Sequence, residues 1–103
     1  MTAITVTTIT LKPGRYDDYY ELVARKAKPI LESWGAKNVR LLGGMSGDTT
    51  GTVAFVMETD DFAAAGAISD KAMADPDISA MMKSSPDGPM AGYQTSQWMD
   101  IPL

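Results

Sequence analysis

The stretch AITVTTITLKPGRYDDYY, residues 3–20, decides the fold of this 103-residue chain. Its first half is rich in Ile, Val and Thr, which strands favour, so we expect a strand over Ala3–Leu11. Pro13 suits the first turn of a helix, where its missing N–H would have no partner in any case. Asp17 and Asp18 then complement the positive end of the helix dipole. The stretch therefore predicts a strand followed directly by a helix.

The predicted helix carries an apolar stripe on one side. Its members recur at spacings of three and four residues and are Tyr16, Tyr20, Val23, Ala27, Ile30 and Trp34. Tyr16, Tyr19 and Tyr20 cannot all face the core, so at least one of them should be exposed or line a cavity. Its hydroxyl could act as a weak acid, but solvent-exposed packing against the following turn is the favoured alternative. Pro29 should kink the helix or begin a new turn, and Gly35 should end it.

The remainder of the chain continues with strands and helices separated by turns. We expect strands over residues 37–45, 52–58 and 92–101. We expect helices over residues 62–73 and 78–82, the longer one capped by Asp60 or Asp61, and turns over residues 46–51 and 84–89. The run Val53–Met57 does not alternate, so its strand should be buried on both faces and central in the sheet.

The order strand–helix–strand–strand–helix–strand is typical of a ferredoxin-like α+β fold with a four-stranded antiparallel sheet. The chain has room for a single domain of this kind, spanning residues 1–103. Both helices would cover one face of the sheet, and the other face would be bare and partly apolar. We therefore expect a homodimer in which two bare sheet faces pack together.

Composition excludes several classes of function. The formal charge is −4, with nine basic residues among thirteen acids, so nucleic acid and an anionic membrane surface are not expected partners. The chain has no Cys and no His, which removes the thiolate nucleophile, the usual general base and the commonest metal ligand. The start of the chain has no signal-peptide pattern, so we expect a cytoplasmic protein.

At this point the chain resembles the dimeric α+β barrel superfamily, which includes antibiotic-biosynthesis monooxygenase-like and NIPSNAP-like proteins. The entry Leu11–Tyr19, LKPGRYDDY, looks like the strand-to-helix entry of these proteins, and Lys28–Glu32 followed by Gly35 looks like the end of the same helix in NIPSNAP-like members. The resemblance to dimeric barrels agrees with the homodimer expected from the bare sheet face, and no catalytic residue is carried over from it. Haem-degrading members hold the iron through histidine, so the resemblance does not extend to haem here.

The first pair of candidate site residues is Asn38 and Arg40, which share one face of a predicted strand. If they face a cavity, Arg40 could bind a carboxylate or enolate oxygen and Asn38 could donate a hydrogen bond to it. The alternative is an inter-subunit salt bridge or a solvated strand edge.

Three aromatic residues complete the set of candidates. Trp34, Tyr93 and Trp98 could wall a pocket for a small molecule. Packing explains Trp34 equally well, and Trp98 could instead anchor a dimer. The acidic pairs at residues 60–61 and 75–77 are explained by helix capping, so we expect no metal site.

Two functions are compatible with these patterns. The first is a small-molecule-binding protein or cofactor-independent enzyme, of the monooxygenase, cyclase or isomerase kind, acting on a small apolar or aromatic substrate. It would need a carboxylate with a raised pKa as base, and no residue can be named for that role. The alternative is a non-catalytic dimeric module that binds a ligand or assists assembly. An open cavity between the sheet and the helices that contains Arg40 or Tyr93 would favour the enzyme, and a filled core would favour the module.

Overall fold

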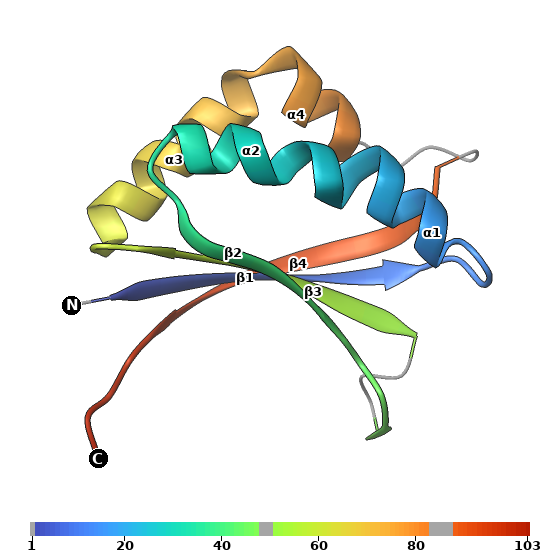
Figure 1. The fold of residues 1–103 in the computed structure, drawn as a ribbon, viewed down its shortest axis with the longest axis horizontal. Helices are drawn as coiled ribbons and strands as arrows, with labels where there is room; N and C mark the ends of the chain where they lie inside the picture. The colour runs from blue at the N-terminus through green and yellow to red at the C-terminus, as the bar shows by residue number, and fades with distance from the viewer. Residues whose placement is uncertain (1, 48–50, 83–87) are drawn as a thin grey trace.

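Four antiparallel strands form one sheet in the computed structural model, which describes residues 2–47, 51–82 and 88–103. The strands are β1 (Ala3–Leu11), β2 (Lys37–Gly43), β3 (Thr52–Thr59) and β4 (Met90–Met99). Their order across the sheet is β2-β3-β1-β4, so β3 is an interior strand as predicted. The ferredoxin-like α+β prediction is confirmed (Figure 1).

The helices lie together on one side of the sheet (Figure 1). They are α1 (Tyr16–Tyr19), the π-helical segment η1 (Tyr20–Ala24), α2 (Arg25–Ser33), α3 (Phe62–Ala74) and α4 (Pro76–Met82). Among the described residues no helix is both long and apolar enough to cross a membrane. We call the opposite side of the sheet the open face.

Strand β1 sets the two faces because it pairs along its length with β3 on one side and β4 on the other. Thr5 and Ile9 point to the helices and are buried, whereas Ile4 and Val6 alternate with them and lie on the open face. Since paired residues share a face, the side chains opposite Ile9, which are Val53 and Tyr93, also point to the helices.

The first helix departs from the prediction in its phase. Tyr16 and Tyr20 are 47% and 41% exposed, whereas Tyr19 is 1% exposed. The cause is η1, where the N–H of Arg25 bonds to the carbonyl of Tyr20, five residues back. A π turn holds one more residue than an α turn. Tyr19 therefore takes the angular position that Tyr20 would have in a regular helix, and the predicted stripe is wrong at its N-terminal end.

Most helix ends lie near the predicted positions. Gly35, at φ 103°, ends α2: its N–H bonds to the carbonyl of Glu32 at 3.1 Å and that of Ala36 to Leu31 at 3.0 Å. These two bonds form the Schellman motif, which favours glycine at the left-handed position. The helix starts at Tyr16, after the Pro13 turn, and α2 continues through Pro29 to Ser33.

Two strands differ from their predicted bounds by two residues. Strand β2 ends at Gly43, two residues early, and β4 runs two residues earlier than expected, from Met90 to Met99. The predicted turns at 46–51 and 84–89 fall partly on residues 48–50 and 83–87, which lie outside the described residues.

Asp61 and Asp75 begin the two helices that follow β3. The Asp61 carboxylate accepts the N–H of Ala64 at 2.7 Å and caps α3. The Asp75 carboxylate accepts the N–H groups of Asp77 and Ile78 at 2.9 and 3.0 Å, at the start of α4. Asp60, the other predicted cap, instead pairs with the Lys37 ammonium at 2.6 Å.

The buried side chains form two clusters under the helices. One joins α2, β3, α3 and α4 and contains Ala27, Leu31, Ala36, Val39, Met57, Ile68 and Ile78. The other lies under α1 and η1 and contains Ile9, Tyr19, Val23, Ala24, Val53 and Met90. Phe55 and Met81 are partly buried and pack against both clusters. The core is therefore divided, and these two residues connect its halves.

Replacing Asp61 with Ala should lower the free energy of unfolding by about 1 kcal/mol, because the first turn of α3 loses its cap. Asp60→Ala is the matched control, since it removes only an exposed ion pair with Lys37, and such pairs contribute little to stability. Both values come from urea denaturation at one fixed protein concentration. Equal losses in the two variants would contradict the assignment of Asp61 as the cap.

Candidate functional site

A cavity of about 150 Å³ lies where the two core clusters meet, between the sheet and the helices. We call it the inner cavity. Its walls come from the helices and from β1, β3 and β4, and are Thr5, Thr7, Ile9, Tyr19, Val23, Ala27, Leu31, Phe55, Met57, Ile68, Ser69, Ala72, Ile78, Met81 and Thr95. Protein interiors rarely leave voids larger than a water molecule, so a space of this size marks a candidate ligand site.

The inner cavity is apolar apart from a few neutral hydroxyls. Three of them bond across strands: Thr5 donates to the Gln97 side-chain oxygen at 3.0 Å, and the Thr7 and Thr95 hydroxyls lie 3.3 Å apart. Among the described residues that line it, none is charged. The site therefore favours a neutral, largely apolar occupant, because a charged one would lose its hydration without a counter-charge.

Tyr19 is the largest polar side chain in this wall. It is almost completely buried, and burial raises the pKa of its phenol above the ordinary value, so the group stays protonated. Its hydroxyl has no hydrogen-bond partner among the described residues, and no fully enclosed side-chain polar atom is left unpaired there. Tyr19 lines the inner cavity, so its phenol belongs to that wall.

A shallower groove continues outward from the inner cavity. Its volume is about 460 Å³, and it is lined by Ser69, Ala72, Met73, Ile78, Ser79, Tyr93 and Thr95. Four of these residues, Ser69, Ala72, Ile78 and Thr95, also line the inner cavity. The groove between α3, α4 and the edge strand β4 is therefore the entrance to the inner cavity.

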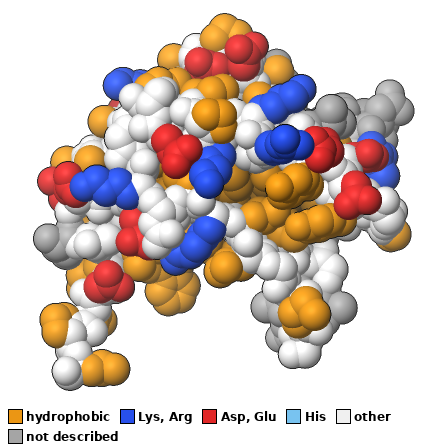
Figure 2. All heavy atoms as spheres, in the orientation of Figure 1, with side chains coloured by type: hydrophobic (Ala, Val, Ile, Leu, Met, Phe, Trp, Pro, Cys, Tyr) orange, Lys and Arg blue, Asp and Glu red, His pale blue; other side chains and the backbone are white. Residues whose placement is uncertain are grey.

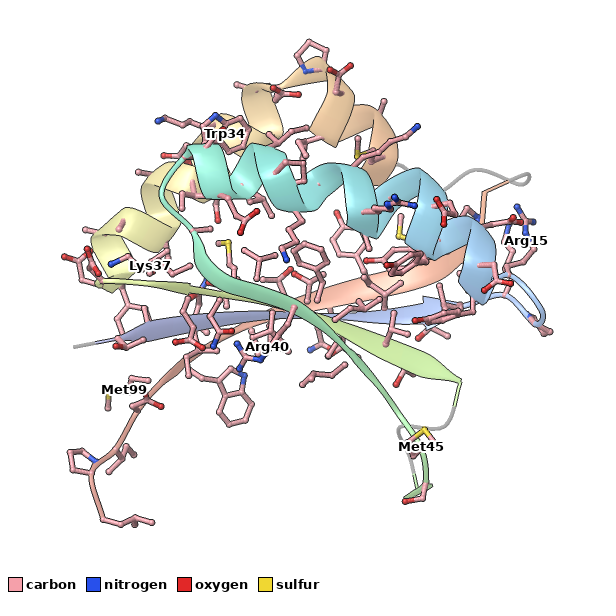
Figure 3. The ribbon with its side chains drawn as sticks, viewed as in Figure 1. Arg15, Trp34, Lys37, Arg40, Met45 and Met99 are labelled. Carbon is pink, nitrogen blue, oxygen red and sulfur yellow. The ribbon has the colours of Figure 1, made fainter. Side chains whose placement is uncertain are left out.

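Arg40 and Asn38 lie on the open face, away from this cavity. Figure 3 shows Arg40 on the side of the sheet opposite the helices. Arg40 and Asn38 both donate to one carboxylate oxygen of Glu58, at 2.8 and 2.7 Å. The hydrogen bond from Arg40, followed by that from Asn38, lowers the pKa of the Glu58 carboxyl.

The network of Asn38, Arg40 and Glu58 depends on a bulge in β2. The register between β2 and β3 shifts between Lys37 and Arg40, and Asn38 has a left-handed φ of 49°. Arg40 also donates to the backbone carbonyl of Asn38 at 2.9 Å, which holds the bulge closed. The network therefore stabilises the bulge in β2 and pairs the charges of Arg40 and Glu58 on the open face.

The three aromatic candidates occupy separate places. Trp34 follows the end of α2 and packs, partly buried, against the first core cluster (Figure 3). Trp98 is 59% exposed on the open face, where its indole N–H donates to the Ser96 hydroxyl at 2.8 Å. Tyr93 lines the outer groove and is half-exposed.

The five candidates thus divide between two faces of the sheet. Asn38, Arg40 and Trp98 share the open face, while Tyr93 alone lines a hollow on the helix side. Ser69, Thr5 and Thr7 are not among the site residues predicted from the sequence. The sequence also does not show which of the three tyrosines, Tyr19 among them, lines a cavity. Thr5, Thr7 and Ile9 follow one another at every second position on one side of β1. This pattern indicates an inner wall that carries hydroxyl groups beside apolar side chains.

Charged side chains of both signs are interspersed over the helices and the edge of the sheet (Figure 2). No single-sign patch is visible on that face in the part of the chain that the structure describes. In the same described part, no group of three or more acidic side chains converges as it would around a metal ion.

Solved structures share this fold. A NIPSNAP-like domain protein from Burkholderia xenovorans superposes with a TM-score of 0.77 at 10% identity, covering 97% of this chain and 85% of that one. A putative antibiotic biosynthesis monooxygenase from Bordetella bronchiseptica gives 0.74 at 16% identity, covering 98% of both chains. A dabb family protein with a ferredoxin-like fold from Mesorhizobium loti gives 0.68 at 21% identity, covering 99% of this chain and 100% of that one.

No protein-family model matches the chain, and no curated protein matches it. At identities of 10%, 16% and 21% the likeness to the solved structures shows the fold alone. The resemblance to NIPSNAP-like, antibiotic-biosynthesis monooxygenase-like and dabb proteins is therefore confirmed in three dimensions: this chain has their ferredoxin-like α+β fold.

Proposed function

We propose that this protein binds a small, neutral, predominantly apolar molecule in the inner cavity. The observation that carries the proposal is a space of about 150 Å³ with apolar walls, uncharged among the described residues, that opens into a groove. A dry apolar cavity of similar size is enough to bind a single aromatic ring. With the groove included, the space reaches the size range of small-molecule sites.

Catalysis is the second candidate, favoured by the fold shared with a putative antibiotic biosynthesis monooxygenase. A reaction through an enol would need a base beside the substrate. Tyr19 stays protonated because burial raises its pKa, and the described lining residues include no carboxylate. Arg40 and Asn38 lie on the other face of the sheet, bound to Glu58. Binding therefore ranks ahead of catalysis.

The open face supports a homodimer as the second part of this proposal. Leu42 and Trp98 are 49% and 59% exposed there, and Ile4 and Val6 lie between them on β1. The Arg40 and Glu58 charges of this face already pair with each other, 2.8 Å apart. A second copy would therefore meet an apolar surface without an unmatched charge, which favours face-to-face packing of two sheets.

Filling the junction of cavity and groove should abolish binding. Neutral aromatic probes such as cumene and indole, at ten times their dissociation constant, should stabilise the protein by about 1.4 kcal/mol and raise Tm by roughly 5–10 °C. Ala72→Phe places a ring at the junction, because Ala72 borders both spaces. This variant should show no shift in differential scanning calorimetry.

The control for this test is Ala67→Phe, the same change at an exposed position of α3. It should keep the full probe-induced rise in Tm. A wild-type protein that gains no stability from any apolar probe would rule out the binding function, as would equal shifts in the two variants.

Val6→Lys tests the homodimer. In a face-to-face dimer the new ammonium would be buried without a partner, so the dimer dissociation constant should rise roughly a hundredfold or more. Sedimentation equilibrium measures this change, and Ala67→Lys on α3 is the control that should leave assembly unaltered. A monomeric wild-type protein at tens of micromolar, or a dimeric Val6→Lys variant, would contradict the proposal.

The Arg40–Glu58 pair should make the protein acid-sensitive. Because folding lowers the pKa of Glu58, the pair stabilises the fold above the pKa of an unfolded Glu, about 4.3, and this contribution disappears as pH falls through the lower folded value. Glu58→Gln and Arg40→Met should each flatten the fall in urea midpoint in that acid range. If both variants lose stability with acid as steeply as the wild type, the pair is not the cause.

A further inference from the structure

We propose that the Tyr19 hydroxyl is the recognition group of the inner cavity and donates a hydrogen bond to an acceptor oxygen of the ligand. The ligand class is then a neutral molecule with an apolar, ring-sized body and a carbonyl-type oxygen, such as an aryl ketone or a quinone. This inference rests on the proposed binding function and names the chemistry that the same site selects.

The first argument is the unpaired state of a deeply buried phenol. Tyr19 is 1% exposed and lines the cavity, yet its hydroxyl has no partner among the described residues. A buried hydroxyl normally finds a partner, because leaving it unpaired is costly. A ligand oxygen in the cavity supplies the partner that the described part of the protein does not.

An irregular turn of the first helix places Tyr19 at the cavity. Tyr19 reaches the cavity because η1, directly after it, holds one extra residue in its turn. Without that turn the inward position would fall to Tyr20, which instead is exposed and stacks against Tyr16 with ring centroids 6.3 Å apart. π turns are rare in proteins as a whole, but those that occur are often found at functional sites. The irregular turn thus brings one particular phenol to the cavity.

The third argument is that the neighbouring hydroxyls are already used. Thr5 is bonded to Gln97, and Thr7 and Thr95 are bonded to each other, so these groups hold strands together. The Ser69 hydroxyl has no partner among the described residues, but it lies at the junction with the groove and not at the inner end. Tyr19 therefore offers the donor for the buried end of a ligand, and Ser69 one for its outer end.

The fourth argument concerns charge. A carboxylate in the cavity would meet neutral hydroxyls and apolar walls, with no cation among the described lining residues. Removing its hydration would cost far more than one neutral hydrogen bond returns. A ketone loses much less hydration and gains the same hydrogen bond. The site therefore selects the neutral acceptor over its charged analogue.

The test compares three probes that share a phenyl ring: acetophenone, cumene and benzoate. Cumene matches the shape of acetophenone but lacks the oxygen, and benzoate carries a charge. Isothermal titration of the wild-type protein should rank acetophenone above cumene and show no binding of benzoate. Tyr19→Phe, which removes only the hydroxyl, should weaken acetophenone binding about fivefold to tenfold and leave cumene binding unchanged.

Two further measurements exclude a purely structural role of Tyr19. The carbonyl stretch of bound acetophenone should move to lower frequency in the wild-type protein and return toward its unbonded value in Tyr19→Phe. The free variant should be as stable as the wild type, since the lost hydroxyl had no partner among the described residues. Tyr20→Phe, at the exposed neighbour, is the matched control and should change neither affinity nor frequency.

The outcomes separate this inference from the proposed function. If cumene binds and Tyr19→Phe leaves acetophenone affinity unchanged, the cavity is a ligand site but Tyr19 is not its donor. If Tyr19→Phe weakens both probes equally or unfolds the free protein, the hydroxyl is structural and the inference is wrong. If neither neutral probe binds the wild-type protein, the binding function fails and this inference fails with it.

Discussion

The double pairing of β1 is the constraint on which the other features depend. β1 is bonded to β3 and β4 over nearly its full length, so its alternation fixes which residues of three strands face the helices. Thr5 and Thr7 line the inner cavity, while Ile4 and Val6, one position away, lie on the open face. The proposed ligand site and the proposed dimer face are therefore two sides of one strand. Packing of a second copy against Val6 would stiffen the wall of the cavity behind it.

The cavity between the two core clusters affects the stability of the fold. The side chains around this unfilled space of about 150 Å³ lack packing partners on their inner side. Phe55 and Met81 touch both clusters, yet they do not close the gap between them. A bound apolar molecule would restore these contacts, which is why binding should stabilise the fold so visibly.

The sequence was sufficient for features that local chemistry decides. The Ile/Val/Thr run of β1, the glycine that ends α2 and the interior position of β3 each follow from residue type and spacing, and each is found. The phase of the first helix was not predictable in this way, because a helical period of 3.6 residues places Tyr20, not Tyr19, toward the core. Asn38 and Arg40 do share a face, but which face looks into a cavity depends on packing across the sheet. The cavity itself is a space between elements, and no residue pattern encodes a space.

The positions of the charged and the neutral polar groups bear on whether the proposed function is binding or catalysis. The network of Arg40, Asn38 and Glu58 lies on the open face, where the charges of Arg40 and Glu58 pair with each other. The cavity instead has a phenol that burial keeps protonated, beside threonines that bond to neighbouring strands. A protonated phenol can orient a carbonyl and polarise it, but it cannot remove a proton from the carbon beside it. The described lining of the cavity therefore suits the proposed function, in which it holds and orients a neutral carbonyl compound.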